Sequence, residues 1–383
     1  MKITKKLITK IEGEANLKIY KNGKLIDFVE IEFWQYRGIE KFLENRPYLD
    51  ACVINPRICG ICGHSHLIAT SKAIEDALNI KITKKAEILR EITLGLEIIQ
   101  NHVKWFYLTL FPSVKEINFF KALEFSKEIS KIIALIAGQF PHNSYSIPGG
   151  VTCDLTNLEI IKVKNCLFEM FDKYQEFMDI DGKSKDLENL FSDIPKTIGR
   201  GLNRFLVLGS SLYFIPNGET KFLKEKKSTS LNKNVLYKDK FFEVGPLSRN
   251  LENKIVKNIY KKYSDSSYTR IFARLYEVNL IFKYLLKIID EIDINEKSYI
   301  KSTKNSGKGI GVIEAPRGSL IHEIEIEDGK IKKYNIIVPT QFNLSNGDKL
   351  NPSPAQASLM KEDENYIDLI FKCFDICAVC VSH

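Results

Sequence analysis

Apolar residues recur at helical spacing over several long segments of the chain. Between Lys84 and Phe111, residues such as Ile88, Ile92 and Leu96 repeat at intervals of three or four, which is typical of one buried helix face. Similar patterns cover Phe119 to Ala137, Leu155 to Met178, Thr269 to Ile292 and Pro354 to Phe374. The middle of the chain is therefore predicted to consist mainly of long helices.

Strict alternation of apolar and polar residues predicts β-strands nearer the ends. The segment Glu14 to Trp34 alternates around Asn22-Gly23, a pair suited to a type I′ turn because both central positions need positive φ. A second alternating segment, Ser319 to Val338, turns at Asp328-Gly329. Together these patterns predict an α+β fold, predominantly α, with a long central helix bundle and small peripheral β-sheets.

The chain has no recognisable internal repeat and no clear domain boundary, so we expect one domain over residues 1–383. The stretch 216–240 is rich in Lys, Ser, Thr and Asn, which predicts an exposed loop. The longest apolar runs are far shorter than the roughly 18 residues of a membrane span, and the first residues lack the apolar core of a signal peptide. We therefore expect no membrane span and a cytoplasmic location.

Composition and charge limit the classes of binding partner that we expect. With 383 residues, 44% of them hydrophobic, the chain can bury a sizeable core. The 56 Lys and Arg residues exceed the 48 Asp and Glu residues, for a net charge of +8, but the lysines are widely spread. No Arg-rich or aromatic-basic motif is present, so a nucleic-acid partner is not expected.

Two C-x-x-C pairs stand near opposite ends of the chain: Cys59/Cys62 in R-I-C-G-I-C-G-H-S-H and Cys377/Cys380 in D-I-C-A-V-C-V-S-H. Thiolates are soft ligands that favour zinc, iron-sulfur clusters or redox-active transition metals. The pairs of a structural zinc site usually lie within about 20 residues of each other, which favours a redox or catalytic metal here. A structural zinc or iron-sulfur protein remains an alternative. The other four cysteines stand singly and are expected to be small buried apolar residues: Cys52, Cys153, Cys166 and Cys373.

The two cysteine motifs resemble the first and last signatures of the large, catalytic subunit of nickel-iron hydrogenases, R-x-C-G-x-C-x-x-x-H and D-x-C-x-x-C-x-x-H. The end of the chain, from Pro352 onward, resembles the cytoplasmic uptake and hydrogen-sensing branch. Other matching segments are Ile11 to Gly13, Arg37 to Glu40, Pro141-His142 with Pro148 to Val151, Gly245 to Arg249, Arg270 to Glu277 and Glu314 to Gly318.

The resemblance implies reversible, heterolytic cleavage of H2 to protons and electrons at a thiolate-bridged nickel-iron centre. By analogy, Cys59 and Cys377 are terminal nickel ligands, and Cys62 and Cys380 bridge nickel to an iron that carries CO and cyanide.

The same resemblance assigns roles around the metals. Glu12 matches a proton-relaying glutamate, and Asp375 is expected to pair with Arg317. The residues that match groups binding the cyanide-bearing cofactor are Pro316, Arg317, Pro339 and Thr340. Glu40 and His383 match ligands of a magnesium or iron ion, while Arg57 and His66 are expected to support the ligands from behind.

Partners follow from the resemblance as well. Electrons are expected to leave through an iron-sulfur small subunit in an obligate heterodimer, and maturation factors are expected to insert the metals. Many relatives carry an extension beyond the histidine that matches His383, which is removed after nickel insertion. The bulky Ile61 and Phe111 favour the alternative of an H2-sensing regulatory subunit that signals to a kinase, although both residue types are also common in cores.

Overall fold

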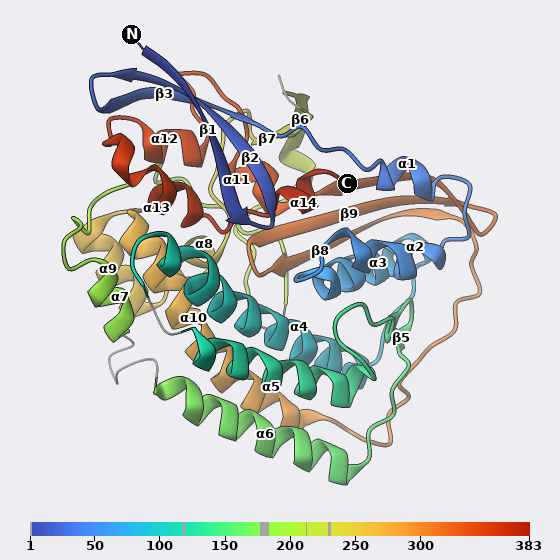
Figure 1. Cartoon of the computed structure of the whole chain (residues 1–383). Helices are drawn as coiled ribbons and strands as arrows, with labels where there is room; N and C mark the ends of the chain where they lie inside the picture. The colour runs from blue at the N-terminus through green and yellow to red at the C-terminus, as the bar shows by residue number, and fades with distance from the viewer. Residues whose placement is uncertain (1, 117–118, 177–183, 212, 229–230) are drawn as a thin grey trace.

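The computed structural model describes residues 2–116, 119–176, 184–211, 213–228 and 231–383. Four long helices form its centre: α4 (Lys84–Lys104), α5 (Phe120–Ala137), α6 (Asn157–Gln175) and α10 (Ser267–Ile288). Helix α4 packs on α5 and α10, and α6 packs on α5 and α10, as Figure 1 shows. The helical predictions for these four segments are confirmed, although residues 177 and 178 lie outside the described part.

An N-terminal sheet of order β1-β2-β3 lies across one end of this bundle (Figure 1). Its strands are β1 (Lys2–Ile11), β2 (Gly13–Asn22) and β3 (Leu25–Glu32). The predicted hairpin is confirmed, but the predicted type I′ turn at Asn22-Gly23 is wrong: Asn22 belongs to β2 and pairs with Leu25, and only Gly23, with a φ of 64°, has positive φ in this turn. The strand β1 was not predicted, because its lysines interrupt the alternation.

A second sheet has the order β10-β9-β8 and packs on helix α3 (Gly63–Leu78). Its strands are β8 (Gly307–Ala315), β9 (Gly318–Glu327) and β10 (Lys330–Ile337). The predicted β9–β10 hairpin is present, with its turn at Asp328 and Gly329. Strand β8 escaped prediction because glycines replace apolar residues on its inner face.

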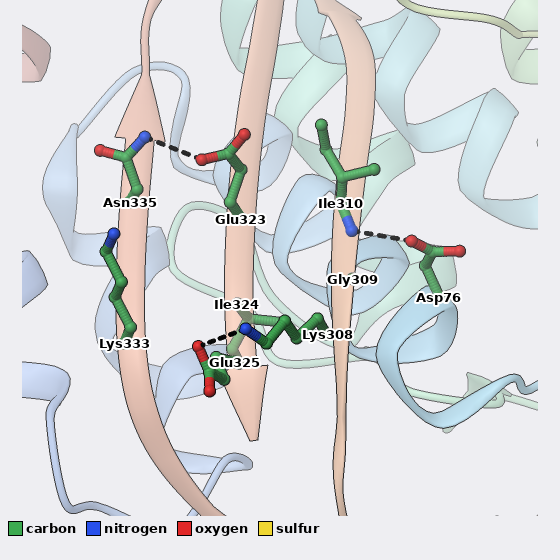
Figure 2. A pocket seen from close by; sticks show the side chains of 9 residues that line it. All are labelled: Asp76, Lys308, Gly309, Ile310, Glu323, Ile324, Glu325, Lys333 and Asn335. Carbon is green, nitrogen blue, oxygen red and sulfur yellow. Dashed lines mark hydrogen bonds and ion pairs between the residues drawn. The ribbon is translucent and has the colours of Figure 1, made fainter. Parts of the chain in front are cut away.

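Those glycines bring two backbones into direct contact. A Cβ atom added at Gly311 would lie 2.0 Å from the carbonyl oxygen of Ala69, and one at Gly309 would lie 2.2 Å from the backbone nitrogen of Ala77. Figure 2 shows how Asp76, near the end of α3, also accepts a hydrogen bond of 2.9 Å from the backbone N–H of Ile310. Strand β8 and helix α3 therefore fit together only without side chains between them.

The solvent side of this sheet carries charges that pair with one another. In Figure 2, Lys308 lies 3.2 Å from Glu325, and the amide of Asn335 donates to Glu323 at 3.0 Å. Because these charged and polar side chains pair with one another, the hollow over β8 to β10 is typical of a solvent-exposed sheet face. The two C-x-x-C pairs do not line it.

Most described residues of 216–240 are exposed, as expected, but the segment is not a loop throughout, and residues 229 and 230 lie outside the described part. Strands β6 (Leu223–Lys227) and β7 (Lys233–Tyr237) form an antiparallel pair. Val235 and Tyr237 are buried against Leu206 and Phe342. The apolar run of β7, Val235 to Tyr237, is only three residues long and stands among lysines, so composition concealed it.

The expected helix over Pro354 to Phe374 is divided into α12 (Pro354–Leu359), a 3-10 turn and α13 (Ile367–Lys372). No helix in the described ranges combines the length and apolar character that a membrane crossing needs. The remaining elements are α1 (Ile39–Leu43), α2 (Asp50–Ile54), β4 (Ser146–Ile147), β5 (Gly150–Val151), α7 (Lys185–Leu190), α8 (Pro246–Asn250), α9 (Lys254–Tyr263), α11 (Pro339–Asn343) and α14 (Ala378–Val381). Overall, the predicted α+β class with a helical majority is confirmed.

Candidate metal centre

The two C-x-x-C pairs meet in the interior. The Sγ atoms of Cys59 and Cys377 lie 3.7 Å apart, those of Cys62 and Cys380 3.4 Å apart, and those of Cys377 and Cys380 2.8 Å apart. All four sulfurs lie within 4.8 Å of one another and all four residues are buried. Four convergent thiols at this spacing can share one or two metal ions.

The first pair is positioned by helix α3, which begins directly after Cys62. The backbone N–H of Cys62 points at the sulfur of Cys59 at 3.4 Å. Glu97 on α4 accepts hydrogen bonds of 2.9 Å from the backbone N–H groups of His64 and Ser65, which would otherwise lack partners at a helix start. Helix α4 thus fixes the turn that holds both thiols.

The second pair is positioned by the link between β1 and β2. Glu12 forms a parallel backbone bridge with Cys377, and its carbonyl accepts a 3.0 Å hydrogen bond from the N–H of Val379. The adjacent Gly13 has a φ of 91°, and a Cβ there would lie 3.1 Å from the Cβ of Ala378. Glycine therefore lets the link approach the second cysteine turn closely. Figure 1 shows α14 beside this end of the sheet.

Arg37 joins the two cysteine segments, a role that sequence reasoning did not assign. Its guanidinium donates to the carbonyl oxygens of Ile58 at 2.7 Å and Val379 at 2.6 Å, and to Ser382 Oγ at 3.1 Å. Ile58 precedes Cys59 and Val379 precedes Cys380, so one side chain spans both turns. The sequence did contain a signal for this role: Arg37 lies in the family-like segment Arg37 to Glu40, but only Glu40 was given a function from the sequence.

Glu12 and Cys59 both have shifted pKa values. Burial raises the pKa of Glu12 above its ordinary value, and negative charge on Cys59 raises it further. Hydrogen bonds from the thiols of Cys377, Cys380 and Cys62 lower the pKa of Cys59 well below its ordinary value. A carboxyl with a raised pKa in the environment of a thiolate is suited to exchanging protons with it.

Polar groups reach a small cavity beside the sulfurs. Nε of Arg317 donates to the backbone carbonyl of Asp375 at 2.8 Å, and Nη2 lies 3.1 Å from the carboxylate of the same residue. The expected pairing of these residues is therefore present. The hydroxyl of Thr340 accepts a 3.3 Å hydrogen bond from the N–H of Cys377. The cavity is lined by Cys62, Ser65, His66, Ala315, Pro316, Arg317, Leu320, Val338, Pro339, Thr340, Cys377 and Cys380.

One hydrogen-bond donor among the groups that line the cavity has no acceptor among the described residues. Nη1 of Arg317 is buried and has no hydrogen-bond partner among the described residues. A buried guanidinium nitrogen without a partner costs free energy unless an acceptor is supplied. The cavity therefore suits a group that combines thiolate-bound metal with a small hydrogen-bond acceptor.

Glu40 and His383 also come together, at the end of α14. Nε2 of His383 lies 3.6 Å from a carboxylate oxygen of Glu40. Glu40 also accepts from the backbone N–H of Ile336 at 2.8 Å and from Nζ of Lys233 at 3.1 Å. The predicted pair of ligands is thus within reach of one ion, with a lysine of β7 beside it.

His66 and Arg57 differ in their placement. His66 lines the cavity, whereas Arg57 is exposed and donates to the carbonyl of Val53, so the expectation that Arg57 supports the ligands is wrong. Arg57 lies in the 3-10 helix Asn55–Ile58, before the C-x-x-C turn, and its side chain is on the exposed side. Behind His66, its Nδ1 lies 3.0 Å from Nε2 of His322, whose Nδ1 lies 2.8 Å from the hydroxyl of Tyr334.

Thr70 closes this row of polar groups. The hydroxyl of Tyr334 accepts from Asn55 at 2.8 Å and donates to the hydroxyl of Thr70 at 3.2 Å, which also lies 3.2 Å from Nδ1 of His322. Burial lowers the pKa of His66 to about 3, which keeps it neutral. His66 is therefore a neutral imidazole at the cavity wall, held from behind by buried polar groups.

Comparison with known proteins agrees with this geometry. The family model for nickel-dependent hydrogenases matches residues 37–110 and 211–383. The alpha chain of coenzyme F420 hydrogenase from Methanothermobacter thermautotrophicus is 26% identical, over 91% of this chain and 85% of the relative. The alpha chain of sulfhydrogenase 2 from Pyrococcus furiosus is 26% identical, over 98% of this chain and 97% of the relative.

Solved structures share the fold. The Ni-Fe-Se hydrogenase from D. vulgaris Hildenborough superposes with a TM-score of 0.91 at 20% identity, covering 100% of both chains. The [NiFeSe]-hydrogenase from Dm. baculatum superposes with a TM-score of 0.88 at 22% identity, again covering 100% of both chains. The family match includes all four cysteines that converge in the interior, and the chain belongs to the nickel-dependent hydrogenase family as a large, catalytic subunit.

Proposed function

We propose that the four thiolates hold a nickel-iron centre in which Cys59 and Cys377 are terminal nickel ligands and Cys62 and Cys380 bridge the two metals. The convergence of four buried sulfurs within 4.8 Å carries this proposal. When bound, such a centre supplies the redox chemistry for reversible, heterolytic cleavage of H2. The protein's own residues move protons and orient the ligands.

Glu12 is the proposed proton relay between the sulfurs and the surface. It is half-buried, its backbone pairs with Cys377, and its pKa is raised by burial and by Cys59, which makes the carboxyl a better proton acceptor than an exposed glutamate. Lys104 is also part of this environment, because its positive charge lowers the pKa of Glu12, although by less than burial and Cys59 raise it. Glu12 is thereby suited to hold a proton transiently.

Arg317 and Thr340 are the proposed partners of two cyanide ligands on iron. The unpaired Nη1 of Arg317 supplies one donor, and the hydroxyl of Thr340 supplies the other, since it accepts from Cys377 and keeps its own proton free. Pro316 and Pro339 form an apolar part of the cavity wall beside these two donors. Apolar surroundings with two directed donors suit CO and cyanide together, because cyanide accepts hydrogen bonds strongly.

Glu40 and His383 are the proposed ligands of a magnesium or iron ion that fastens the end of α14. A carboxylate oxygen suits magnesium, while the histidine nitrogen also allows iron. The ammonium of Lys233 competes for Glu40 and is expected to move aside or bond a metal-bound water.

An iron-sulfur small subunit is the proposed electron acceptor, in an obligate heterodimer. Apart from the four clustered cysteines, no group of three or more residues with metal-ligating geometry occurs in the part of the chain that the structure describes. Cys52 and Cys373 are buried and Cys153 and Cys166 are partly buried, all singly. A cytoplasmic location remains part of this proposal; the relatives include a periplasmic enzyme.

Metal analysis combined with infrared spectroscopy of the purified complex tests the proposal. We expect nickel and iron with stretching bands of CO and cyanide. Zinc alone, without such bands, would overturn the nickel-iron assignment. H2-driven dye reduction then separates a catalytic enzyme, which turns over rapidly, from an H2 sensor, which is slow.

A further inference from the structure

Two buried arginines outside the cavity hold the backbone that presents Arg317. Nη1 of Arg249 donates to the carbonyl of Ala315 at 2.7 Å, and its Nη2 donates to the carbonyl of Pro316 at 3.3 Å. Nη1 of Arg274 donates to the same Pro316 carbonyl at 3.3 Å. Both carbonyls that immediately precede Arg317 in the tight β8–β9 turn are therefore fixed by guanidinium groups.

Arg274 also orients the side chain of Arg317 through Asp375. Its Nη1 donates to Oδ2 of Asp375 at 2.8 Å, while Nη2 of Arg317 lies 3.1 Å from Oδ1. The two oxygens of one carboxylate thus bind two guanidinium groups. Because Nε of Arg317 is held by the Asp375 carbonyl, the plane of its guanidinium is fixed and only Nη1 remains for the cavity.

Glu277 secures the arrangement from α10. Its carboxylate accepts from Nε of Arg249 at 2.6 Å, from Nη2 at 2.5 Å, and from Nε2 of His102 at 2.7 Å. Burial alone would raise the pKa of Glu277, but the Arg249 guanidinium and His102 together outweigh burial and lower the pKa to about 2. Three arginines face three carboxyl groups in this buried network: Arg249, Arg274 and Arg317 with Glu277, Glu314 and Asp375.

We propose that Arg249 and Arg274 are positioning residues that set the direction of Arg317 Nη1 and, through it, the hydrogen bond to a diatomic ligand of iron. The inference rests on the proposed function, because it needs that ligand in the cavity. Lysine cannot replace either residue, since a single ammonium nitrogen lacks the planar set of donors that binds a carboxylate and a carbonyl together.

The test compares Arg274→Lys and Arg249→Lys with Arg270→Lys in the metal-loaded heterodimer. Arg270 is a matched control: it lies on the same helix as Arg274, is buried, and binds Glu243 through two hydrogen bonds of 2.8 Å and the Gly199 carbonyl at 2.6 Å. These three hydrogen bonds go to Glu243 and Gly199 rather than to Ala315, Pro316 or Asp375, and the guanidinium also lies 4.4 Å from the centroid of the Phe374 ring. All three variants keep the charge and remove one buried guanidinium.

We expect Arg274→Lys and Arg249→Lys to retain nickel and iron, to shift the cyanide bands in the same direction as Arg317→Lys, measured alongside them, and to lower H2 oxidation by about 10- to 100-fold. Arg270→Lys should leave the bands at their wild-type positions. If Arg274→Lys fails to retain metal, Arg249→Lys decides, because it leaves the Asp375 pair intact.

Two outcomes contradict the inference and can be told apart. Cyanide bands that move in Arg317→Lys but stay in place in both positioning variants would overturn this inference alone. A wild-type spectrum without diatomic bands would overturn the proposed function, and this inference with it.

Discussion

Glu12 and Cys377 form a parallel backbone bridge, although nearly the whole chain separates them. The bridge holds the candidate proton relay and a candidate nickel ligand in fixed register. It depends on Gly13, whose positive φ and missing side chain allow the β1–β2 link to lie against Ala378 and Val379. Backbone pairing therefore holds Glu12, and with it its carboxyl group, in a fixed position relative to Cys377.

Replacing Glu12 by Gln should slow H/D exchange catalysed with D2 by about 10²- to 10⁴-fold, the usual contribution of a positioned acid-base group. Nickel and iron content should remain at wild-type levels, because glutamine keeps the shape and the backbone bridge. Glu14→Gln, two residues along and exposed, is the control and should exchange normally. Loss of metal in Glu12→Gln would instead identify a structural acid.

Arg37→Met should weaken retention of the metals by about 10- to 100-fold, because it removes three hydrogen bonds that join the two cysteine turns. Nickel content after dialysis against a chelator measures the effect. Arg57→Met removes an arginine that is close to Cys59 in sequence but exposed, and it should retain metal like the wild type. Equal losses in both variants would argue against the bridging role of Arg37.

Gly311→Ala should destabilise the protein by about 1–3 kcal/mol, because the new Cβ would lie 2.0 Å from the Ala69 carbonyl and would push strand β8 away from α3. Denaturant unfolding measures this free energy. Lys308→Ala on the same strand changes a side chain that is 78% exposed, so it should stay within about 0.5 kcal/mol of wild type. Similar stabilities for the two variants would contradict the direct backbone contact.

Stability should depend on pH through Glu91 on α4. Burial raises the pKa of Glu91 from 4.5 to about 7, so the folded protein binds a proton that the unfolded chain releases in this interval. The corresponding stability is complete below pH 4.5 and is lost as the pH rises through 7. Glu91→Gln should remove this loss, of about 2 kcal/mol at most, in urea unfolding at about pH 5 and about pH 8.

Glu87→Gln is the control for that measurement. Glu87 lies one turn earlier on α4 and pairs at the surface with Lys84 at 3.4 Å. Its replacement should leave the fall in stability between the two pH values in place. A wild-type slope in Glu91→Gln as well would assign the pH dependence to other groups.

Contacts between residues far apart in the sequence were predictable where the residues belong to distinctive metal-binding motifs. The four cysteines, Glu40 and His383 could be proposed from their motifs, and the structure brings each set together. The helices of the centre were predictable because their periodicity is long. Strand β7 was not predictable, because its three apolar residues stand in a lysine-rich segment that resembles a loop. Strand β8 was not predictable, because glycines stand where apolar residues would mark its inner face.

The arginines behind the cavity show a different limit. Arg249 and Arg274 stand in segments that match the family, but a buried arginine and a surface arginine look alike in sequence. Only the fold reveals that their donors meet at Ala315 and Pro316. Arg37 and Arg57 give the converse case, since the residue nearer Cys59 in sequence makes the less useful contact.

The glycine positions of β8 also bear on mechanical stiffness. Packed backbones contain no side-chain torsions that could absorb a displacement, so strand and helix shift as one unit. Cys62 stands at one end of that helix and Arg317 follows that strand. The distance between the Cys62 sulfur and the Arg317 guanidinium therefore depends on how tightly the glycines at 307, 309 and 311 let the two backbones pack. Evolutionary change at these glycines would loosen the metal site without touching a single ligand.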